Sequence, residues 1–323
     1  MALRDFFISL SENQVLSNAA QQYGLKLGAK SFVAGTTIPE VIENIKALNA
    51  QGISCTVDNL GEIVSDEAEA TKAKVEILSM IEAIHEQQLD AHISLKPSQL
   101  GLDIDIDYCY DNLREIVERA DEYGIYVNID TEDYKRLQPS FDMFEELHKS
   151  FDNVSTVIQA YFHRSKDDVE QFKDYRLRIV NGASKEPEEI AFQDTLEIDI
   201  NFLELIEYHL AHGAFTSIAT HDHNMIQHVR YFVEENQIPK DKFEFQMVYG
   251  FKKDLQLELA REGFQVSVYM PYGKDWYGYF MRRLAERPQN LNLVTKQVFN
   301  KKTNTVLAVA AGAFLLGRLT KKK

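Results

Sequence analysis

The chain has 323 residues, of which 45% are hydrophobic and 26% are charged, a composition that supports a sizeable core and argues against long disorder. Its formal net charge of −15 disfavours a nucleic-acid partner, because the phosphates would be repelled. Two isolated cysteines, Cys55 and Cys109, form neither a disulfide framework nor a zinc site, which favours a reducing, cytoplasmic setting. The first residues, MALRDFFISLSENQ, include Asp5 and lack a long apolar run, so we do not expect a signal peptide.

Strand-like runs alternate with helical patterns from residue 29 onward, after one or two helices predicted in residues 1–28. Eight runs each lead into a helix, and they cover residues 32–35, 53–62, 90–97, 125–133, 154–165, 175–184, 215–223 and 243–250. A further strand-like run, 265–273, is surplus to this count and leads into a last helix. No linker rich in proline, glycine or serine interrupts the series.

This alternation predicts a parallel sheet, and eight units in a chain of this length favour an α/β fold of the closed (β/α)8 TIM-barrel type. We expect three parts: a helical extension over residues 1–28, a catalytic barrel over 29–298 and a tail over 299–323. The run at 265–273 would place the last helix over the mouth of the barrel.

Polar side chains follow the predicted strands at the end where barrel enzymes have their active sites. In chain order they are Asp58, Glu62, Lys96, Asp130, Gln159, Arg164, Arg178, Asn181, Thr220, His221, Asp222, His223, Gln246, Tyr249 and Tyr269. One of them alone, such as Lys96, is more often a solvated side chain. Together they predict a cavity with several cations, which suits an anionic cofactor and a carboxylate substrate.

The last helix includes WYGYFMRRLAER, residues 276–287, which combines aromatic rings with two adjacent arginines. On a helix Tyr279, Arg282, Arg283 and Glu286 share one face, because they lie three and four residues apart. The pattern alone leaves two interpretations open: a solvated basic patch beside a buried apolar stripe, or a clamp for a small carboxylate. A bidentate arginine holds a carboxylate in a fixed orientation, as a positioned hydride transfer requires.

The tail from Phe299 to Lys323 has six basic residues and no acidic ones, and it includes fifteen consecutive uncharged residues, 303–317. As a helix these residues would measure about 22 Å, at about 1.5 Å per residue. The hydrocarbon core of a bilayer is about 30 Å thick, which disfavours a spanning helix. An apolar segment flanked by lysines fits contact with an anionic membrane surface, and a helix buried against the body is the alternative.

Several common catalytic motifs do not occur in the sequence. No G-x-G-x-x-G follows a strand, and there is neither a G-x-x-x-x-G-K-[ST] P-loop nor a G-x-S-x-G nucleophile elbow. The segment HDH, residues 221–223, is a candidate metal site if both His221 and His223 lie in a strand. A metal-dependent TIM-barrel hydrolase built on these histidines is therefore the alternative, although it would need more histidines at other strand ends. We expect no metal.

Six segments occur in one order across roughly residues 30–290: HISLKPSQLGL, VNIDTED, VIQAYFHRS, ATHD, FEFQMVYG and YMPYGKDWYGYFMRRLAER. Together they resemble proline dehydrogenase of the monofunctional bacterial type. The resemblance implies a distorted barrel that binds FAD in its mouth, oxidises L-proline to Δ1-pyrroline-5-carboxylate and passes electrons to a membrane quinone. It also explains the tail, which would provide peripheral membrane contact for a cytoplasmic enzyme. A separate pyrroline-5-carboxylate dehydrogenase is implied as a partner.

The resemblance assigns substrate-binding roles to several residues. Arg282 and Arg283 match a pair that clamps the proline carboxylate, with Lys96 as a third cation. Tyr269 and Tyr279 match tyrosines that contact the proline ring. A further acid, Glu62, matches a residue that pairs with the first arginine and gates the site.

The resemblance assigns the remaining roles to the flavin side of the site. Asp130 matches a carboxylate that orients the cations, and Arg178 matches a cation beside the flavin N5. The implied cofactor contacts are Thr131, Gln159, Arg178, Asn181, Gly182, Ala183, Thr220 and His221.

One turn departs from the family. The family often has K-G-A-Y at the end of the sixth predicted strand run, 175–184, where the present chain has Asn181, Gly182, Ala183 and Ser184. A lysine contact to the cofactor and a tyrosine in the wall are therefore lost, and flavin affinity, redox poise or substrate range is expected to differ.

Overall fold

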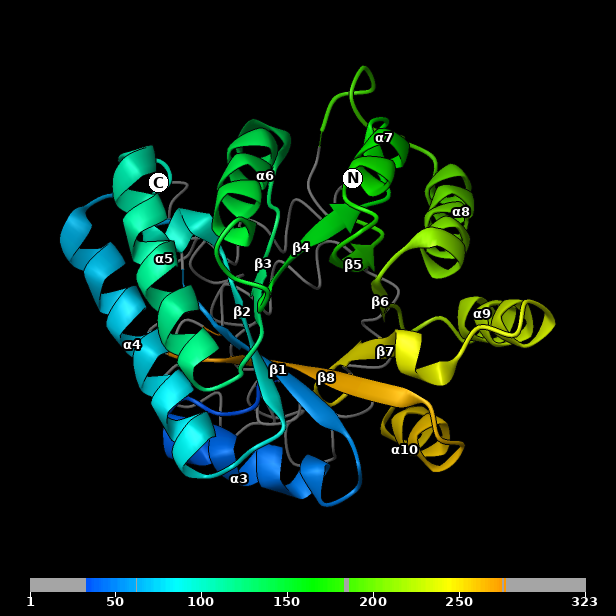
Figure 1. The fold of residues 1–323 in the computed structure, drawn as a ribbon, viewed down its shortest axis with the longest axis horizontal. Helices are drawn as coiled ribbons and strands as arrows, with labels where there is room; N and C mark the ends of the chain where they lie inside the picture. Colours follow the sequence, from blue (N-terminus) through cyan, green and yellow to red (C-terminus); the bar gives the residue numbers. More distant parts are fainter. Residues whose placement is uncertain (1–32, 62, 183–185, 275, 277–323) are drawn as a thin grey trace, which may run out of the picture. The chain divides into compact units, whose positions relative to one another are not determined.

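The computed structural model describes residues 33–61, 63–182, 186–274 and 276, and these residues contain a closed barrel of parallel strands (Figure 1). The strands are β1 (Ser54–Asn59), β2 (Ala91–Leu95), β3 (Val127–Ile129), β4 (Val154–Gln159), β5 (Arg176–Val180), β6 (Phe215–Ala219), β7 (Phe243–Val248) and β8 (Gln265–Tyr272). Each strand pairs with the next, and β8 returns to pair with β1, so the sheet has no open edge. The predicted (β/α)8 barrel is confirmed.

Helices connect the strands and surround the barrel (Figure 1). They are α3 (Ile38–Asn49), α4 (Glu67–Glu86), α5 (Ile106–Glu122), α6 (Tyr134–His148), α7 (Ser165–Gln171), α8 (Thr195–His212), α9 (His223–Glu235) and α10 (Lys253–Arg261), with 3₁₀ turns η3 (Pro97–Leu100) and η4 (Lys240–Lys242). Five helices begin directly after an aspartate whose carboxylate accepts hydrogen bonds from backbone N–H groups of the first turn: Asp66, Asp105, Asp133, Asp194 and Asp222. These N-caps explain where the five helices begin.

The first predicted strand is wrong, and the run predicted as surplus completes the barrel. Residues 33–35 form no strand; Ala34 N donates to Pro271 O at 2.9 Å, Gly35 O accepts from Gly273 N at 3.0 Å, and the chain then turns into α3. The run at 265–273 is instead β8, which pairs with both β7 and β1. The error has a physical reason, because a short apolar run before a glycine does not distinguish a strand from an ordered loop.

The layer between strands and helices is apolar, whereas the inside of the barrel contains many polar side chains. The alternation is visible at β2, where Ile93 and Leu95 belong to the buried core, while His92, Ser94 and Lys96 lie on the opposite face. A TIM-barrel interior is usually filled by branched apolar residues. Polar groups in this position need partners inside the barrel, because burial without a hydrogen bond is costly.

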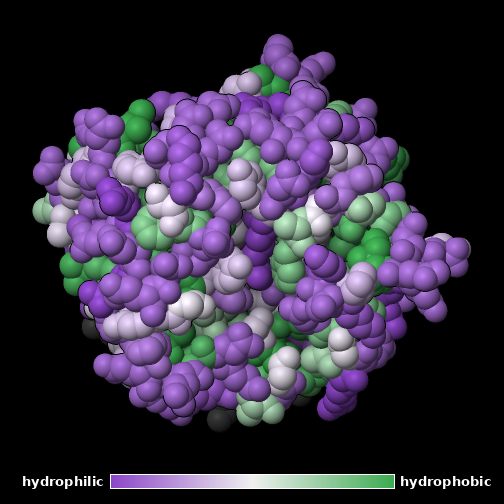
Figure 2. Space-filling model, in the orientation of Figure 1, coloured by the Kyte–Doolittle hydropathy of each residue, from purple (hydrophilic) through white to green (hydrophobic). Residues whose placement is uncertain are grey.

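The residues from Ala34 to Gly273 form one compact unit. The predicted boundaries after residues 28 and 298, the N-terminal helices, the last helix and the tail all fall outside the described residues. Within the described part of the chain, no helix is both long and apolar enough to cross a membrane. Hydrophilic residues cover most of the face in Figure 2, and strongly hydrophilic ones line a hollow near its centre.

Candidate active site

Inside the barrel, near the carboxyl ends of β1 and β2, two side chains converge on a buried carboxylate. Asp58 is fully buried, and its oxygens accept hydrogen bonds from Lys96 Nζ, at 2.9 Å for Oδ1 and 2.7 Å for Oδ2. The hydroxyl of Tyr269, on β8, donates to the same Oδ2 at 2.5 Å. Asp58 therefore orients one side chain from each neighbouring strand region.

A second carboxylate, Asp130, follows β3 directly and is 9% exposed. Its Oδ1 accepts from Arg178 Nη1, Asn128 Nδ2 and Ser94 Oγ, each at 2.8 Å. Ser94 Oγ accepts in turn from Arg178 Nη1 at 3.0 Å, and Lys96 Nζ lies 3.9 Å from Asp130 Oδ2. The two carboxylates therefore belong to one network that Lys96 bridges.

This network is called the upper cluster, and its members are Asp58, Ser94, Lys96, Asp130, Arg178 and Tyr269. The ring centroid of Tyr269 lies 5.4 Å from Arg178 Cζ, a cation–π contact that joins the two halves. Burial alone would lower the pKa of Lys96, but the carboxylates of Asp58 and Asp130 raise it above its ordinary value. Burial likewise raises the pKa of Asp58, and the charge of Lys96 opposes that rise.

Two predicted cofactor contacts, Thr131 and Gln159, lie together after β3 and at the end of β4. Gln159 Nε2 donates to Thr131 Oγ1 at 3.1 Å and to Glu132 O at 2.6 Å. The Thr131 hydroxyl donates in turn to Val157 O at 3.1 Å. Both side chains are thus held by the strand ends rather than by a mobile surface loop.

The turn after β5 contains the predicted contacts Asn181 and Gly182. Asn181 Nδ2 donates to Asp199 Oδ1 of α8 at 2.8 Å, so this amide supports the turn. Gly182 has a φ of +97°, and a Cβ at this position would lie 2.0 Å from Tyr161 Cδ1. Only glycine fits, both for its backbone conformation and for the close approach of the ring.

The segment after β6 contains Thr220 and His221. Thr220 Oγ1 accepts from Asp222 N at 3.1 Å, which steadies the start of α9. His221 Nε2 accepts from Val248 N at 2.8 Å. A ring nitrogen that accepts a hydrogen bond has no proton, so His221 is the neutral tautomer protonated on Nδ1.

The geometry does not favour the metal-dependent hydrolase. His221 Nε2 is already engaged by a backbone N–H, and His223 begins α9 with an exposed side chain. Across residues 33–61, 63–182, 186–274 and 276, no group of three or more side chains is arranged to hold a metal ion. The hypothesis required both histidines to lie in one strand, and they do not.

Five predicted site residues lie outside the described residues: Glu62, Ala183, Tyr279, Arg282 and Arg283. The carboxylate clamp therefore stays a prediction. Four predicted residues meet in the upper cluster: Lys96, Asp130, Arg178 and Tyr269. Asp58 was predicted only as one of the polar strand ends, and Ser94 was not predicted, although it lies two residues before Lys96 and so shares its face of β2.

A second polar group fills the barrel nearer the amino ends of β2 and β5. Arg176 Nη2, Ser217 Oγ and Gln246 Nε2 all donate to Glu244 Oε1, at 2.8, 2.6 and 2.7 Å. His92 Nδ1 is buried with no hydrogen-bond partner among the described residues, and burial lowers the pKa of His92 to about 4. These five residues are called the lower cluster.

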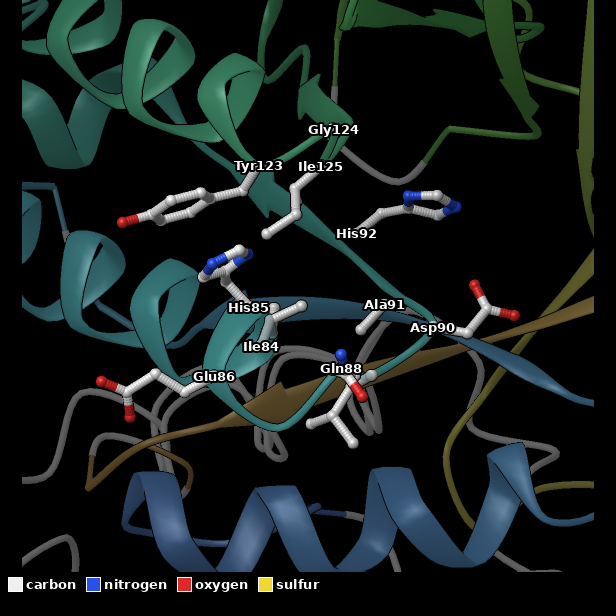
Figure 3. A pocket seen from close by; sticks show the side chains of 11 residues that line it. Ile84, His85, Glu86, Gln88, Asp90, Ala91, His92, Tyr123, Gly124 and Ile125 are labelled. Atoms are coloured by element: carbon white, nitrogen blue, oxygen red, sulfur yellow. The ribbon is translucent and has the colours of Figure 1, made fainter.

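A cavity of about 520 Å³ lies at the amino end of β2, between the ends of α4 and α5 (Figure 3). The rings of His85 and Tyr123 stack in its wall with centroids 3.8 Å apart, and His92 and Asp90 also line it. Among the described residues, no lysine or arginine lines this cavity, so it offers no permanent cation to a carboxylate. The upper cluster is the better candidate, because barrel enzymes have their sites at the carboxyl ends of the strands.

Comparison with known proteins points to one family. The sequence profile described as proline dehydrogenase matches residues 41–296. "Proline dehydrogenase 2" of Bacillus subtilis (strain 168) is 42% identical over 303 residues, which cover 93% of this chain and 100% of that protein. "Proline dehydrogenase" of Deinococcus radiodurans is 38% identical over 300 residues, covering 91% of this chain and 96% of that protein.

Longer proteins also match. "Bifunctional protein PutA" of Escherichia coli (strain K12) is 24% identical over an alignment of 343 positions, which covers 90% of this chain but 26% of that protein. Among solved structures, proline utilization A from Bdellovibrio bacteriovorus, inactivated by N-propargylglycine, has a TM-score of 0.76 at 22% identity. The match covers 88% of this chain and 36% of that chain. At this identity the likeness supports the barrel fold alone.

Proposed function

The chain belongs to the proline dehydrogenase family, and from that premise we propose that it is an FAD-dependent enzyme that oxidises L-proline to Δ1-pyrroline-5-carboxylate. The observation that supports this most directly is the upper cluster. Asp130 and Ser94 hold the guanidinium of Arg178 inside the barrel, next to the strand end that carries Lys96. A fixed cation in such a place suits an acceptor that gains negative charge.

The described residues fit FAD. Arg178 is 5% exposed, and its Nε is buried with no hydrogen-bond partner in the described part of the chain. A buried donor without an acceptor costs free energy, and a flavin ring offers acceptors. We propose that FAD, when bound, supplies the hydride acceptor. The residues that would hold it are the predicted contacts Thr131, Gln159, Arg178, Asn181, Gly182, Ala183, Thr220 and His221.

The substrate carboxylate needs cations beyond the upper cluster. Asp58 and Asp130 balance Lys96 and Arg178, so the cluster has no formal net charge. An ammonium has three N–H donors, and Lys96 uses two of them on Asp58, which leaves one for a carboxylate. We propose that the clamp is completed by residues outside the described part of the chain, namely Arg282 and Arg283, with Glu62 pairing the first arginine.

The chain's own residues then orient proline for hydride loss from C5. The clamp fixes the carboxylate, Tyr269 and Tyr279 contact the ring, and the ring nitrogen must be unprotonated so that its lone pair assists. We propose no general base at Asp130, because its Oδ1 already accepts three hydrogen bonds and its Oδ2 lies 3.9 Å from the ammonium of Lys96. Asp130 instead keeps Arg178 in place, where the positive charge stabilises negative charge formed on the acceptor.

A visible absorption spectrum tests the proposal. Purified protein should be yellow and should bleach when L-proline is added without oxygen. The control ligand is cyclopentanecarboxylate, which keeps the ring and the carboxylate but lacks the nitrogen, and should leave the colour unchanged. Colourless protein, or a spectrum that L-proline does not change, would contradict the proposed function.

We further propose that the electrons pass to a membrane quinone and that residues 299–323 provide peripheral contact with the membrane from the cytoplasm. The support is the basic, apolar composition of this tail. Deleting residues 303–323 should leave dye-coupled oxidation of L-proline intact and should abolish binding to vesicles with anionic headgroups. Vesicle binding that survives the deletion rules out this anchor.

We also propose that the product passes to a separate pyrroline-5-carboxylate dehydrogenase. The Bacillus subtilis relative is matched over 100% of its length, whereas the bifunctional PutA of Escherichia coli is matched over 26%. The purified protein with L-proline and a dye should therefore accumulate pyrroline-5-carboxylate, even when NAD is present. Reduction of NAD by the purified protein would show that the second activity is not separate.

A further inference from the structure

Asp58 contacts two residues of the proposed substrate site and has no exposed surface of its own. Its side chain is fully buried, while the side chain of Lys96 is 26% exposed. The carboxylate binds Lys96 Nζ through both oxygens and also accepts from the Tyr269 hydroxyl. Any effect of Asp58 on the reaction must therefore pass through Lys96 and Tyr269.

We propose that Asp58 is a positioning residue that sets the affinity for the substrate carboxylate by holding Lys96 and Tyr269 in place. The inference rests on the proposed function, since it concerns the same site.

The strand order explains why one carboxylate holds two distant residues. Asp58 lies on β1, which pairs with β2 on one side and with β8 on the other. Lys96 directly follows β2, and Tyr269 lies on β8, so both partners come from the neighbours of β1. A lysine side chain has many rotamers, and fixing its ammonium before the substrate arrives reduces the entropy lost on binding.

The charges around Lys96 give a second consequence. Burial lowers the pKa of Lys96, and Asp58, Asp130 and Glu132 raise it. Neutralising Asp58 removes one of the anions that oppose burial, so the ammonium should lose its proton at a lower pH. Carboxylate binding should then fail earlier on the alkaline side.

The variant Asp58→Asn tests this with cyclopentanecarboxylate as the ligand, measured by titration calorimetry on the FAD-loaded full chain. Above about pH 6 this ligand has no titrating group, so the pH dependence reports the protein alone. We expect about tenfold weaker binding near neutral pH, the scale of one charge-assisted hydrogen bond, and an alkaline loss of binding that moves to lower pH. The KM for L-proline should rise by a similar factor, while kcat changes by less than about threefold.

Glu244→Gln is the matched control. Glu244 is also a fully enclosed carboxylate, 2% exposed, that accepts from a cation and a hydroxyl inside the same barrel. The isosteric change should leave ligand affinity, its pH dependence and the KM unchanged. A general weakening of the barrel would alter both variants alike.

The inference is overturned if Asp58→Asn binds as the wild type does with the same pH dependence, or if Glu244→Gln weakens binding equally. If Asp58→Asn does not fold, Tyr269→Phe removes one of the two contacts without changing the charge. It should weaken binding by about threefold and leave the alkaline loss in place, and wild-type affinity would overturn the inference. A wild-type protein that lacks FAD and proline oxidation contradicts the proposed function instead, so the two failures are distinguishable.

Discussion

Arg176 and Arg178 lie two residues apart on β5, both inside the barrel, yet their surroundings differ. Arg176 packs between the rings of Tyr126 and Phe215, with Cζ 4.9 and 4.1 Å from the centroids, and pairs with a carboxylate that two further donors satisfy. Arg178 has a buried Nε with no partner among the described residues. The lower arginine is a satisfied structural ion pair, whereas the upper one keeps a donor available for a ligand.

The contrast shows how one barrel accommodates polar groups for two purposes. A buried ion pair is seldom more stable than an apolar replacement of the same shape, but removing one partner leaves a costly unpaired charge. The lower cluster therefore affects stability when it is broken. The upper cluster retains donor capacity at Arg178 and Lys96, so breaking it should affect binding and turnover first. Matched substitutions in the two clusters test this distinction.

Turnover should fall most in the variant Arg178→Met. Removing the cation beside the proposed acceptor should lower kcat for L-proline by about a thousandfold, or about 4 kcal/mol, the upper range for loss of one electrostatic donor. Stopped-flow reduction of the FAD-loaded protein measures this directly. Arg176→Met, two residues earlier on the same strand, should keep kcat within about threefold of the wild type when expressed per folded molecule. Equal losses in both variants would erase the distinction between the clusters.

The next effect is on the stability of that same Arg176→Met variant. It leaves Glu244, which is 2% exposed, without its cation, and the free energy of unfolding should fall by about 3 kcal/mol. Urea unfolding followed by circular dichroism measures the loss. Adding Glu244→Gln should restore part of it, because the uncompensated charge is then removed. A double variant less stable than the single one would show that the charge is not the cause.

Acid pH should lower the stability of the protein through His92, which belongs to the lower cluster. Burial lowers its pKa to about 4 from an ordinary value of about 6.5, so the unfolded chain binds a proton that the folded protein does not. The contribution of neutral His92 to the free energy of unfolding is complete above about pH 6.5 and is lost as the pH falls toward 4. It amounts to about 2 kcal/mol between neutral pH and pH 5.

His209 contributes in the same direction, because burial lowers its pKa to about 4 as well. The test is therefore the difference between the wild type and His92→Gln in urea unfolding at several pH values. The variant should lose less stability on acidification, and His209→Gln should show a separate reduction. Identical pH slopes for His92→Gln and the wild type would mean that His92 is not held neutral in the folded state.

The sequence was sufficient to predict the barrel, since the alternation of strand and helix periodicities is a local signal. It was insufficient to decide that 265–273, rather than 32–35, provides the eighth strand. That decision depends on pairing between Ser54 and Ser267, which are far apart in the chain. The contacts of Asp58 with Lys96 and Tyr269 depend on the same closure and register, so no pattern in the sequence revealed them.

The mildest changes should come from replacing two buried serines, Ser94 in the upper cluster and Ser217 in the lower one. Ser94 Oγ donates to Asp130 and accepts from Arg178, whereas Ser217 Oγ donates to Glu244 at 2.6 Å. Each alanine variant removes a hydroxyl from a buried charged network, worth about 1 kcal/mol.

If the clusters differ as proposed, the loss of a hydroxyl lowers turnover in one variant and stability in the other. Ser94→Ala should lower kcat by about fivefold, because Arg178 is held less firmly, and should change the urea midpoint little. Ser217→Ala should lower the free energy of unfolding by about 1 kcal/mol and leave kcat unchanged. A fall in kcat with Ser217→Ala, or a purely structural effect of Ser94→Ala, would show that the two ion-pair networks act as one unit, and the carboxyl end of the barrel would then hold no separate functional cluster.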